Sequence, residues 1–403
     1  VLTRQVIDPR VDREYAQPSE NISDKAFLVR VPCGPRRYLR KESLWPYLDG
    51  FADQALQHIR RIGRVPDVIH GHYADAGYVS AHLSSVLGVP FIFTGHSLGR
   101  VKKARLLEKG QSELTIEKRY RISRRIEAEE KSLQTADRVI TSTQQEVDEQ
   151  YASYDNYQPE RMRVITPGVD LSRFTSPPRT RFSPPILEEL KRFLTNPKKP
   201  MILAIARADE RKNLITLVSA YAENQTLRDM ANLVIVAGNR DDILHLDLGP
   251  KRVLQELLLT IDRYDLYGSI AYPKTHTPED VPDLYRYAAK RRGVFVNPAL
   301  TEPFGLTLLE AAASGLPVVA TQDGGPKEIL ANCRHGVLID PHDKEGIGLA
   351  IQGILENRTE WKQMSRDAMR NVHAHYTWSG HAEKYIGEIR EITRKKDHHH
   401  TTF

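Results

Sequence analysis

Short apolar runs alternate with longer amphipathic stretches along almost the whole chain. An apolar run bounded by polar turn residues is typical of a buried strand, and the amphipathic stretches between the runs are typical of helices. Strands and helices that alternate in this way predict parallel sheets covered by helices on both faces. The expected strands lie at residues 65–72, 89–96, 138–142 and 163–168 in the first half, and at 201–205, 233–238, 270–272, 293–298 and 316–321 in the second.

Two polar, proline-rich stretches interrupt this alternation at residues 174–179 and 183–185. Such a composition is typical of a linker, so we expect two doubly wound, Rossmann-like α/β domains that face each other across a cleft. Ligands of such sheets bind beyond the carboxyl ends of the strands. The expected parts are a first domain at 1–172, a second domain at 173–376, a helix at 377–395 that packs back on the first domain, and a disordered tail at 396–403.

Composition narrows the class of protein. The 403 residues are 40% apolar and 27% charged, which is typical of a globular protein. No uncharged apolar stretch approaches the ~20 residues that span a bilayer, and the first residues lack the layout of a signal peptide. Two cysteines, Cys33 and Cys333, do not make a disulfide framework. We therefore expect a cytoplasmic protein with no membrane partner, in which both cysteines are buried or half-buried.

The net charge of +6 could indicate nucleic acid as a partner. The basic residues are scattered, however, and residues 124–131 mix them with acids on one expected helix. No basic stripe interleaved with aromatic residues is present, so nucleic acid is not expected. A modest positive excess also fits a site for anionic small molecules.

Residues 302–310 combine two carboxylates with a glycine at the start of an expected helix. Glu302 lies in the loop after a strand, and Glu310 lies about two turns into the helix. Gly305 permits the backbone to approach a ligand closely, and the free N–H groups of Gly305, Leu306 and Thr307 suit a diphosphate. The alternative is an acidic first turn of an ordinary amphipathic helix.

This segment resembles the Glu-x7-Glu motif of retaining glycosyltransferase family four, whose members have the B-type fold of two facing Rossmann-like domains. The resemblance implies a nucleotide-sugar as donor, bound by the second domain. It also implies that Glu302 contacts the hydroxyls of the donor sugar and that Glu310 holds the ribose. The donor residues implied within this segment are Glu302, Phe304, Gly305, Leu306, Thr307 and Glu310.

A second loop of the same expected domain carries Arg207 and Lys212. Two cations at one diphosphate neutralise the charge that develops on a leaving group, and the resemblance assigns both residues this role. No metal site is expected: Mg²⁺ could accompany the donor, but the fold does not require it. Base contacts are expected near residues 272–276, and uridine and adenine donors both stay open. The alternative is that the loop with Arg207 and Lys212 is a charged, solvated turn that binds no ligand.

The first domain is expected to bind the acceptor. Gly95, His96 and Ser97 follow a strand, and a histidine there is by itself more often structural than catalytic. Residues 95–99, together with 70–77, resemble sucrose-phosphate synthases and sucrose synthases. This resemblance implies that His96 meets the donor glucose and that an acceptor phosphate binds in a cationic cluster, with Arg124 as an alternative to Arg125. The implied acceptor residues are Lys41, Tyr73, Asp75, Ser97, Lys102 and Arg125.

The chain departs from the family at its beginning, because no glycine precedes Gly34. Family members carry a glycine-rich loop near the N-terminus, so we expect that the first strand, loop and helix of the first domain are missing here. No phosphatase-like domain is recognisable either. Dephosphorylation of the product would therefore need a separate sucrose-phosphate phosphatase.

The expected function is transfer of glucose from UDP-glucose or ADP-glucose to fructose 6-phosphate with retention, in which His96, Glu302, Arg207 and Lys212 act on the reaction. A sucrose synthase that uses free fructose is the nearest alternative, and a mannosyl donor is a further one. A non-catalytic sugar-binding regulator is the alternative from another class of protein.

Overall fold

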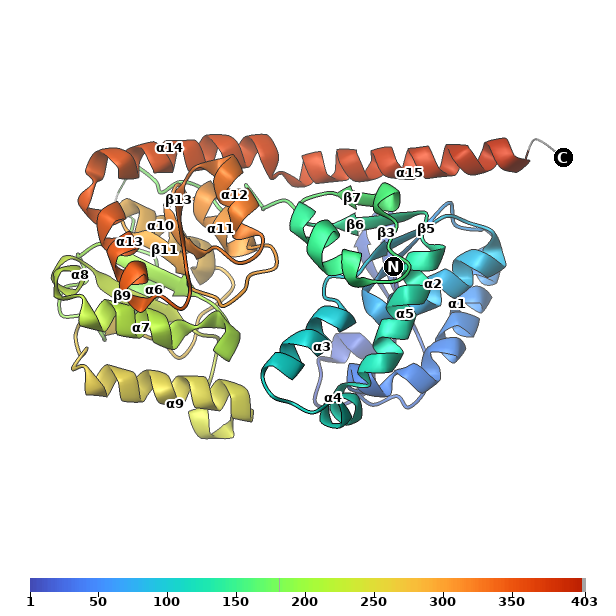
Figure 1. Ribbon diagram of the computed structural model, residues 1–403, viewed down its shortest axis with the longest axis horizontal. Helices are drawn as coiled ribbons and strands as arrows, with labels where there is room; N and C mark the ends of the chain where they lie inside the picture. Colours follow the sequence, from blue (N-terminus) through green and yellow to red (C-terminus); the bar gives the residue numbers. More distant parts are fainter. Residues whose placement is uncertain (181, 401–403) are drawn as a thin grey trace. The chain divides into compact units, whose positions relative to one another are not determined.

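The computed structural model describes residues 1–180 and 182–400, and it describes side chains for 1–180 and 182–394. The chain divides into two compact units. Unit 1 contains Val1–Ile165 and Glu383–Phe403, and unit 2 contains Thr166–Ala382. Both units combine helices with parallel strands (Figure 1), which confirms the predicted pair of Rossmann-like α/β domains.

Unit 1 holds two sheets. A parallel sheet has the strand order β4-β5-β6-β7, and a smaller sheet has the order β1-β3-β2, in which β1 is parallel and β2 antiparallel to β3. The strands are β1 (Leu2–Arg4), β2 (Ser19–Ser23), β3 (Ala26–Val31), β4 (Ile69–His72), β5 (Phe91–Thr94), β6 (Arg138–Thr141) and β7 (Met162–Val164). The helices are α1 (Leu48–Ile62), α2 (Tyr73–Leu87), α3 (Gly99–Glu108), α4 (Glu113–Tyr120) and α5 (Ile122–Thr135).

The core of unit 1 is built around β5, whose Phe91, Ile92 and Phe93 are fully buried. Side chains of a strand alternate between its faces, so Phe91 and Phe93 join one apolar cluster and Ile92 joins another. Gly77 in α2 lets that helix approach the sheet, because a Cβ there would lie 2.6 Å from the ring of Phe93. This packing places the ends of β4 and β5 next to each other.

Unit 2 holds one parallel sheet with the strand order β10-β9-β8-β11-β12-β13, the order of a dinucleotide-binding Rossmann fold. The chain order reverses between β8 and β11, so a crevice opens there at the carboxyl ends of the strands. The strands are β8 (Met201–Ile205), β9 (Asn232–Val236), β10 (Ile270–Ala271), β11 (Val294–Asn297), β12 (Val318–Thr321) and β13 (Gly336–Ile339). The helices are α6 (Ile186–Lys191), α7 (Leu214–Glu223), α8 (Gln225–Met230), α9 (Leu248–Arg263), α10 (Asp280–Lys290), α11 (Leu306–Ala313), α12 (Pro326–Cys333), α13 (Lys344–Glu356) and α14 (Arg358–His375).

Alternate residues of the unit 2 strands face two separate cores, one on each face of the sheet. Leu203 and Phe295 join the core that α11 and α14 cover, whereas Ile202 and Val294 join the core that α7 and α9 cover. Both faces of a doubly wound parallel sheet are buried, which explains why its strands appear in the sequence as continuous apolar runs.

The last helix, α15 (Trp378–His400), belongs to unit 1 from Glu383 onward (Figure 1). Arg138 of β6 pairs with Glu388 and Glu391 of this helix, at 2.7 Å in both cases, and Ile392 is buried against Ile92. The tail expected to be disordered from residue 396 is helical through His400, and residues 401–403 lie outside the described residues.

The sequence predicts that the first domain ends at residue 172. Contacts instead assign the chain from Thr166 onward to unit 2. The reason is backbone pairing, since Val169 donates to the carbonyl of Tyr376 at 3.0 Å and bridges Thr377. Among the described residues, no helix combines the length and apolar character that a bilayer crossing requires.

Candidate functional site

A cavity of about 370 Å³ opens at the point of unit 2 where the strand order reverses. Arg207 enters it from the loop after β8, and Lys212 enters it from the short helix at Glu210–Lys212. Asn297 at the end of β11, Thr307 in the first turn of α11 and His276 complete the polar part of the lining. Two cations and a helix N-terminus at one crevice suit a diphosphate.

Glu302 lies beside this cavity and is bound tightly on several sides. Lys212 pairs with it at 2.7 Å, and the Asn297 amide donates to the same carboxylate oxygen at 3.0 Å. The side chains of Lys212 and Glu302 keep only 25% and 13% of their exposure, so solvent weakens this pair less than it weakens surface pairs. The carboxylate and the cation therefore hold each other in place beside this cavity.

The backbone of the same loop is also fixed. The Glu302 N–H donates to the carbonyl of Asp323, and its carbonyl accepts from Gly325, both at 3.0 Å. Gly324 has φ of +105°, and a Cβ there would lie 2.0 Å from the Glu302 carbonyl oxygen. Only glycine permits this approach.

The predicted donor segment is split between the cavity and the core. Gly305 has φ of +107° and is the N-cap of α11, and Leu306 after it is exposed. The side chain of Phe304 is buried in the core of unit 2 and packs against Tyr376, so any contact of Phe304 with a ligand must come from its backbone. Thr307 is the member of this group that lines the cavity.

Glu310 is half-buried and is not among the residues that line the cavity of unit 2. The hydroxyl of Tyr285 donates to it at 3.0 Å. Burial raises the pKa of Glu310 to about 7, while the Tyr285 hydrogen bond and the charge of Arg173 oppose this rise. Glu310 is thus a hydrogen-bonding group whose charge changes near neutral pH.

The region expected to contact a base, residues 272–276, is held by two residues that the sequence reasoning missed. The Asn239 amide donates to the His276 carbonyl at 3.0 Å and accepts the His276 N–H at 2.8 Å. The guanidinium of Arg240 donates to the carbonyls of Tyr272 and Pro273, both at 3.1 Å. Their position directly after Gly238 and β9 was the available signal, because strand ends of such sheets carry ligand loops.

In unit 1, two residues with left-handed backbone follow the ends of neighbouring strands. Tyr73 after β4 has φ of +75°, and His96 after β5 has φ of +56°. Non-glycine residues rarely adopt this conformation, and such strain concentrates at functional sites. His72, which the sequence reasoning also missed, approaches His96 with 2.9 Å between Nδ1 and Nε2. Burial lowers the pKa of both imidazoles, and His96 lowers the pKa of His72 further.

Five of the six predicted acceptor residues line one small cavity of unit 1, and Ser97 is hydrogen-bonded to one of them, Arg125. Lys41 donates to the Tyr73 hydroxyl at 2.8 Å, and the guanidinium of Arg125 lies 4.6 Å from the centre of the same ring. Arg125 also donates to the carbonyl of Ser97 and, at 3.3 Å, to its hydroxyl. The cavity is lined by Lys41, Glu42, Trp45, Tyr73, Asp75, Lys102, Tyr120 and Arg125.

The helix phase that the sequence left open is now determined. Arg125 is 4% exposed and lines this cavity of unit 1, whereas Arg124 is exposed and pairs with Glu127 at 3.0 Å. The cavity therefore contains Lys41, Lys102 and Arg125 as cations and Glu42 and Asp75 as acids.

Electrostatics indicate what this cavity can bind. Burial, and then the charges of Lys41 and Arg125, lower the pKa of Lys102 to about 8. Burial raises the pKa of Asp75, which lies in the same cavity. Cations that repel one another in a confined space are stabilised by an anion with several acceptor oxygens, such as a phosphate.

The described part of the chain holds no group of three or more His, Cys, Asp or Glu side chains that could bind a metal ion. Cys33 and Cys333 are both free and buried. Burial raises the pKa of the Cys333 thiol to about 12, which is typical of an unreactive structural cysteine.

Comparisons with known proteins match both units to glycosyltransferases. The family described as "Glycosyltransferase Family 4" matches residues 5–173, and "Glycosyl transferases group 1" matches residues 186–371. The chain is 44% identical to probable sucrose-phosphate synthase 1 of Oryza sativa subsp. indica and to the sucrose-phosphate synthase of Zea mays, over 96% of this chain in both cases. These alignments cover 41% and 42% of the two relatives, so the chain spans about two-fifths of their length.

A solved structure gives the same result for the fold. Sucrose-phosphate synthase from Thermosynechococcus elongatus superposes with a TM-score of 0.75 at 25% sequence identity, over 98% of this chain and 88% of that one. The predicted B-type arrangement of two Rossmann-like domains is thereby confirmed as the fold class.

Proposed function

This chain belongs to the glycosyltransferases of the B-type fold and groups with the sucrose-phosphate synthases, and on that premise we propose that it transfers glucose from UDP-glucose to fructose 6-phosphate with retention, giving sucrose 6-phosphate. The observation that carries the choice of acceptor is the confined cluster of Lys41, Lys102 and Arg125 in unit 1. A phosphate group requires several charged donors at one point, whereas a free sugar hydroxyl does not.

Unit 2 supplies the donor half of the reaction in this proposal. Arg207, Lys212 and the first N–H groups of α11 bind the diphosphate of UDP-glucose, and Glu310 accepts a hydrogen bond from the ribose. Glu302 accepts hydrogen bonds from the hydroxyls of the glucose. The fixed Lys212–Glu302 pair supports these roles, because donors that need no rearrangement stabilise developing charge most effectively.

Unit 1 supplies the acceptor half. Lys41, Lys102 and Arg125 bind the phosphate of fructose 6-phosphate, with the hydroxyls of Tyr73 and Ser97 as further donors. Asp75 accepts a hydrogen bond from a sugar hydroxyl, which fits a half-buried carboxyl group in a cavity with cations. His96 orients the transferred glucose.

The proposed chemistry is a transfer on one face of the glucose ring. The bond between glucose C1 and the phosphate oxygen breaks, and the acceptor hydroxyl of fructose 6-phosphate forms the new bond to C1. The proton of that hydroxyl passes to the departing phosphate oxygen. Lys212 and Arg207 stabilise the negative charge of the leaving diphosphate, so the proposal needs no metal ion for this step.

Two further parts of the proposal concern the surroundings of the enzyme. The product carries a phosphate that this chain is not proposed to remove, so a separate phosphatase would consume it. Two free, buried cysteines and the absence of a disulfide between them support a cytoplasmic location.

A panel of donors and acceptors tests the proposal. The purified chain is incubated with UDP-glucose, ADP-glucose or GDP-mannose, each with fructose 6-phosphate or fructose, and the products are identified by chromatography and mass spectrometry. We expect sucrose 6-phosphate from UDP-glucose, with kcat/KM at least about 100-fold lower for fructose, because fructose lacks the phosphate that Lys41, Lys102 and Arg125 are proposed to bind. Faster transfer to fructose would support a sucrose synthase instead, and donor binding without any transfer would support a regulator.

A further inference from the structure

One buried carboxylate connects the acceptor arginine to the helix that follows the His96 loop. Glu129 in α5 is fully buried, and its Oε1 accepts from the Arg125 Nε at 2.9 Å. Its two oxygens also accept the N–H of Gly99, the first residue of α3, at 2.8 and 3.1 Å, and the Tyr154 hydroxyl donates to Oε2. A Cβ on Gly99 would lie 2.8 Å from Glu129 Oε2, so glycine permits this approach.

A negative charge suits this position for two independent reasons. The first N–H groups of a helix have no partner within the helix and carry a partial positive charge, which a carboxylate satisfies at α3. Arg125 is also buried, and a buried cation without a partner is strongly destabilising. Burial raises the pKa of Glu129, and the charge of Arg125 is the largest influence that opposes this rise.

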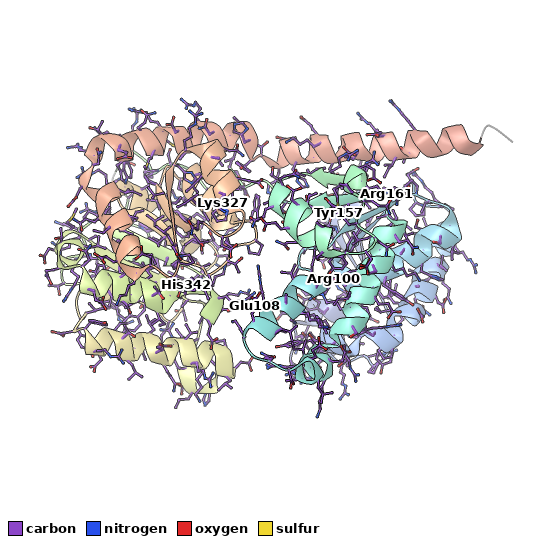
Figure 2. The ribbon with its side chains drawn as sticks, viewed as in Figure 1. Arg100, Glu108, Tyr157, Arg161, Lys327 and His342 are labelled. Carbon is purple, nitrogen blue, oxygen red and sulfur yellow. The ribbon has the colours of Figure 1, made fainter. Side chains whose placement is uncertain are left out.

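Two tyrosines of one neighbouring segment hold the other backbone groups of the loop. The Tyr151 hydroxyl accepts the N–H of Gly95 at 3.0 Å, and the Tyr154 hydroxyl accepts the N–H of Arg100 at 3.1 Å. Arg100 is labelled in Figure 2 and lies in the first turn of α3. His96 lies between these anchors with its left-handed backbone, so the loop is clamped on both sides of a strained residue.

Arg125 closes the connection by donating to the carbonyl of Ser97. A closed path therefore runs from Glu129 through Arg125 to Ser97 and back through Gly99 to Glu129. We propose that Glu129 is a positioning residue that fixes Arg125 and the His96 loop with one carboxylate, so that recognition of the acceptor phosphate and placement of His96 depend on the same group. This inference rests on the proposed function and names a residue that determines its acceptor specificity.

Three variants test the inference. Glu129→Gln keeps the shape of the side chain but replaces one acceptor oxygen by a donor, which faces other donors. Tyr154→Phe removes only the hydroxyl that donates to Glu129 and leaves the Arg125 pair intact. Glu127→Gln is the matched control, because it removes the same charge from the same helix at an exposed residue that pairs with Arg124. For each variant, kcat and KM are measured with fructose 6-phosphate and with fructose, and binding of both acceptors is measured by calorimetry.

The variants are expected to give different results, because Glu129 contacts Arg125 on one side and the His96 loop on the other. Glu129→Gln should lower kcat with both acceptors by about tenfold or more, because the His96 loop loses its anchor. Because Arg125 also loses its partner, the variant should bind fructose 6-phosphate about tenfold more weakly, while its binding of fructose should stay unchanged. Tyr154→Phe should lower kcat with both acceptors, because it disturbs the contacts that hold the His96 loop. KM for fructose 6-phosphate should stay within about twofold of the wild-type value, because the pair of Glu129 with Arg125 is intact. Glu127→Gln should match the wild type in every measurement.

Other outcomes would overturn the inference. Equal losses for both acceptors in Glu129→Gln, with unchanged binding of fructose 6-phosphate, would make Glu129 merely structural. If thermal melting shows that Glu129→Gln does not fold, an unchanged kcat in Tyr154→Phe is by itself enough to overturn the inference. Absence of transfer by the wild type would contradict the proposed function, whereas calorimetric binding of fructose 6-phosphate would still test the link between Glu129 and Arg125.

Discussion

Glu302 in unit 2 and His96 in unit 1 both follow the end of a buried parallel strand, but the chain fixes them by different means. The backbone of Glu302 is hydrogen-bonded on both sides, and its side chain is paired with Lys212. His96 has a strained backbone, and buried side chains of α5 and of residues 151–154 anchor the loop around it. The donor half-site is thus built largely into the sheet and its loops, whereas the acceptor half-site depends on side chains from elsewhere in the unit.

This difference has a functional consequence. A site that is fixed by backbone geometry and that, as proposed, contacts only the donor would serve every acceptor equally. A site assembled from side chains of several elements can be changed residue by residue, so acceptor specificity is expected to reside there. The predictions below test whether changes in unit 2 affect all acceptors alike and whether the charge of the cationic cluster in unit 1 affects only the phosphorylated one.

The largest expected effect is that of Lys212→Met. Removal of this cation takes away a charge proposed to stabilise the leaving diphosphate and leaves the half-buried Glu302 without its ion-pair partner. We expect kcat to fall by about 10²- to 10³-fold, by the same factor with fructose 6-phosphate and with fructose. Steady-state kinetics with both acceptors provide the measurement.

Arg211→Met is the matched control for this prediction. Arg211 is the neighbouring residue, is half exposed and pairs with Asp209 rather than with Glu302. Its loss should change kcat by less than about threefold, as is usual for an exposed pair. A loss in Lys212→Met that differs strongly between the two acceptors would break the distinction between the half-sites.

The positions of Arg207, Lys212 and Glu302 follow from the pattern of strands more directly than the positions of the expected acceptor residues, for a physical reason. Arg207, Lys212, Thr307 and Glu302 lie in two short segments that follow strands, and the Rossmann strand order brings such segments together. The strands were predictable as apolar runs because both faces are buried. The short edge strand β13 was missed, since its Val337 and Leu338 are partly exposed.

In unit 1 the sequence predicted a phosphate cluster from a resemblance but not how it is held. Glu129 and Tyr154 are far from Gly99 in sequence, and a buried carboxylate in a helix looks like an ordinary charged position until its partners are known. The same holds for His72, whose contact with His96 joins the ends of two strands. Such contacts depend on tertiary packing, which no local pattern encodes. The roles of the site residues stay predictions in both units.

The second prediction concerns the pH dependence of the acceptor half-site. Lys102 has a pKa of about 8, below its ordinary value, so it loses its charge as the pH rises through 8. The phosphate of the acceptor is a dianion above its own second pKa, near 6, and therefore binds the charged lysine more tightly. KM for fructose 6-phosphate should rise by up to about tenfold per pH unit above pH 8, the limit for one linked proton. KM for fructose should stay constant.

Lys102→Arg sharpens this prediction, because an arginine stays charged throughout the accessible pH range. The variant should retain binding of fructose 6-phosphate and lose the alkaline rise in KM. The same alkaline rise in Lys102→Arg would assign it to another group and would remove Lys102 from the acceptor site. Calorimetric titration between pH 7 and 9.5 distinguishes these results.

The smallest expected effect is the pH dependence of the donor half-site, and its direction is opposite. Burial raises the pKa of Glu310 to about 7, so the carboxylate gains a proton as the pH falls below 7 and becomes a poorer acceptor for the ribose hydroxyl. The dissociation constant of UDP-glucose should therefore increase about threefold between pH 8 and 6, with one linked proton setting the upper limit. Tyr285→Phe removes the hydroxyl that favours the charged carboxylate. In this variant the increase in the dissociation constant of UDP-glucose at low pH should therefore begin at a higher pH. Glu310→Gln should bind UDP-glucose weakly at every pH. If the dissociation constant of this variant still increases as the pH falls, another group controls donor affinity.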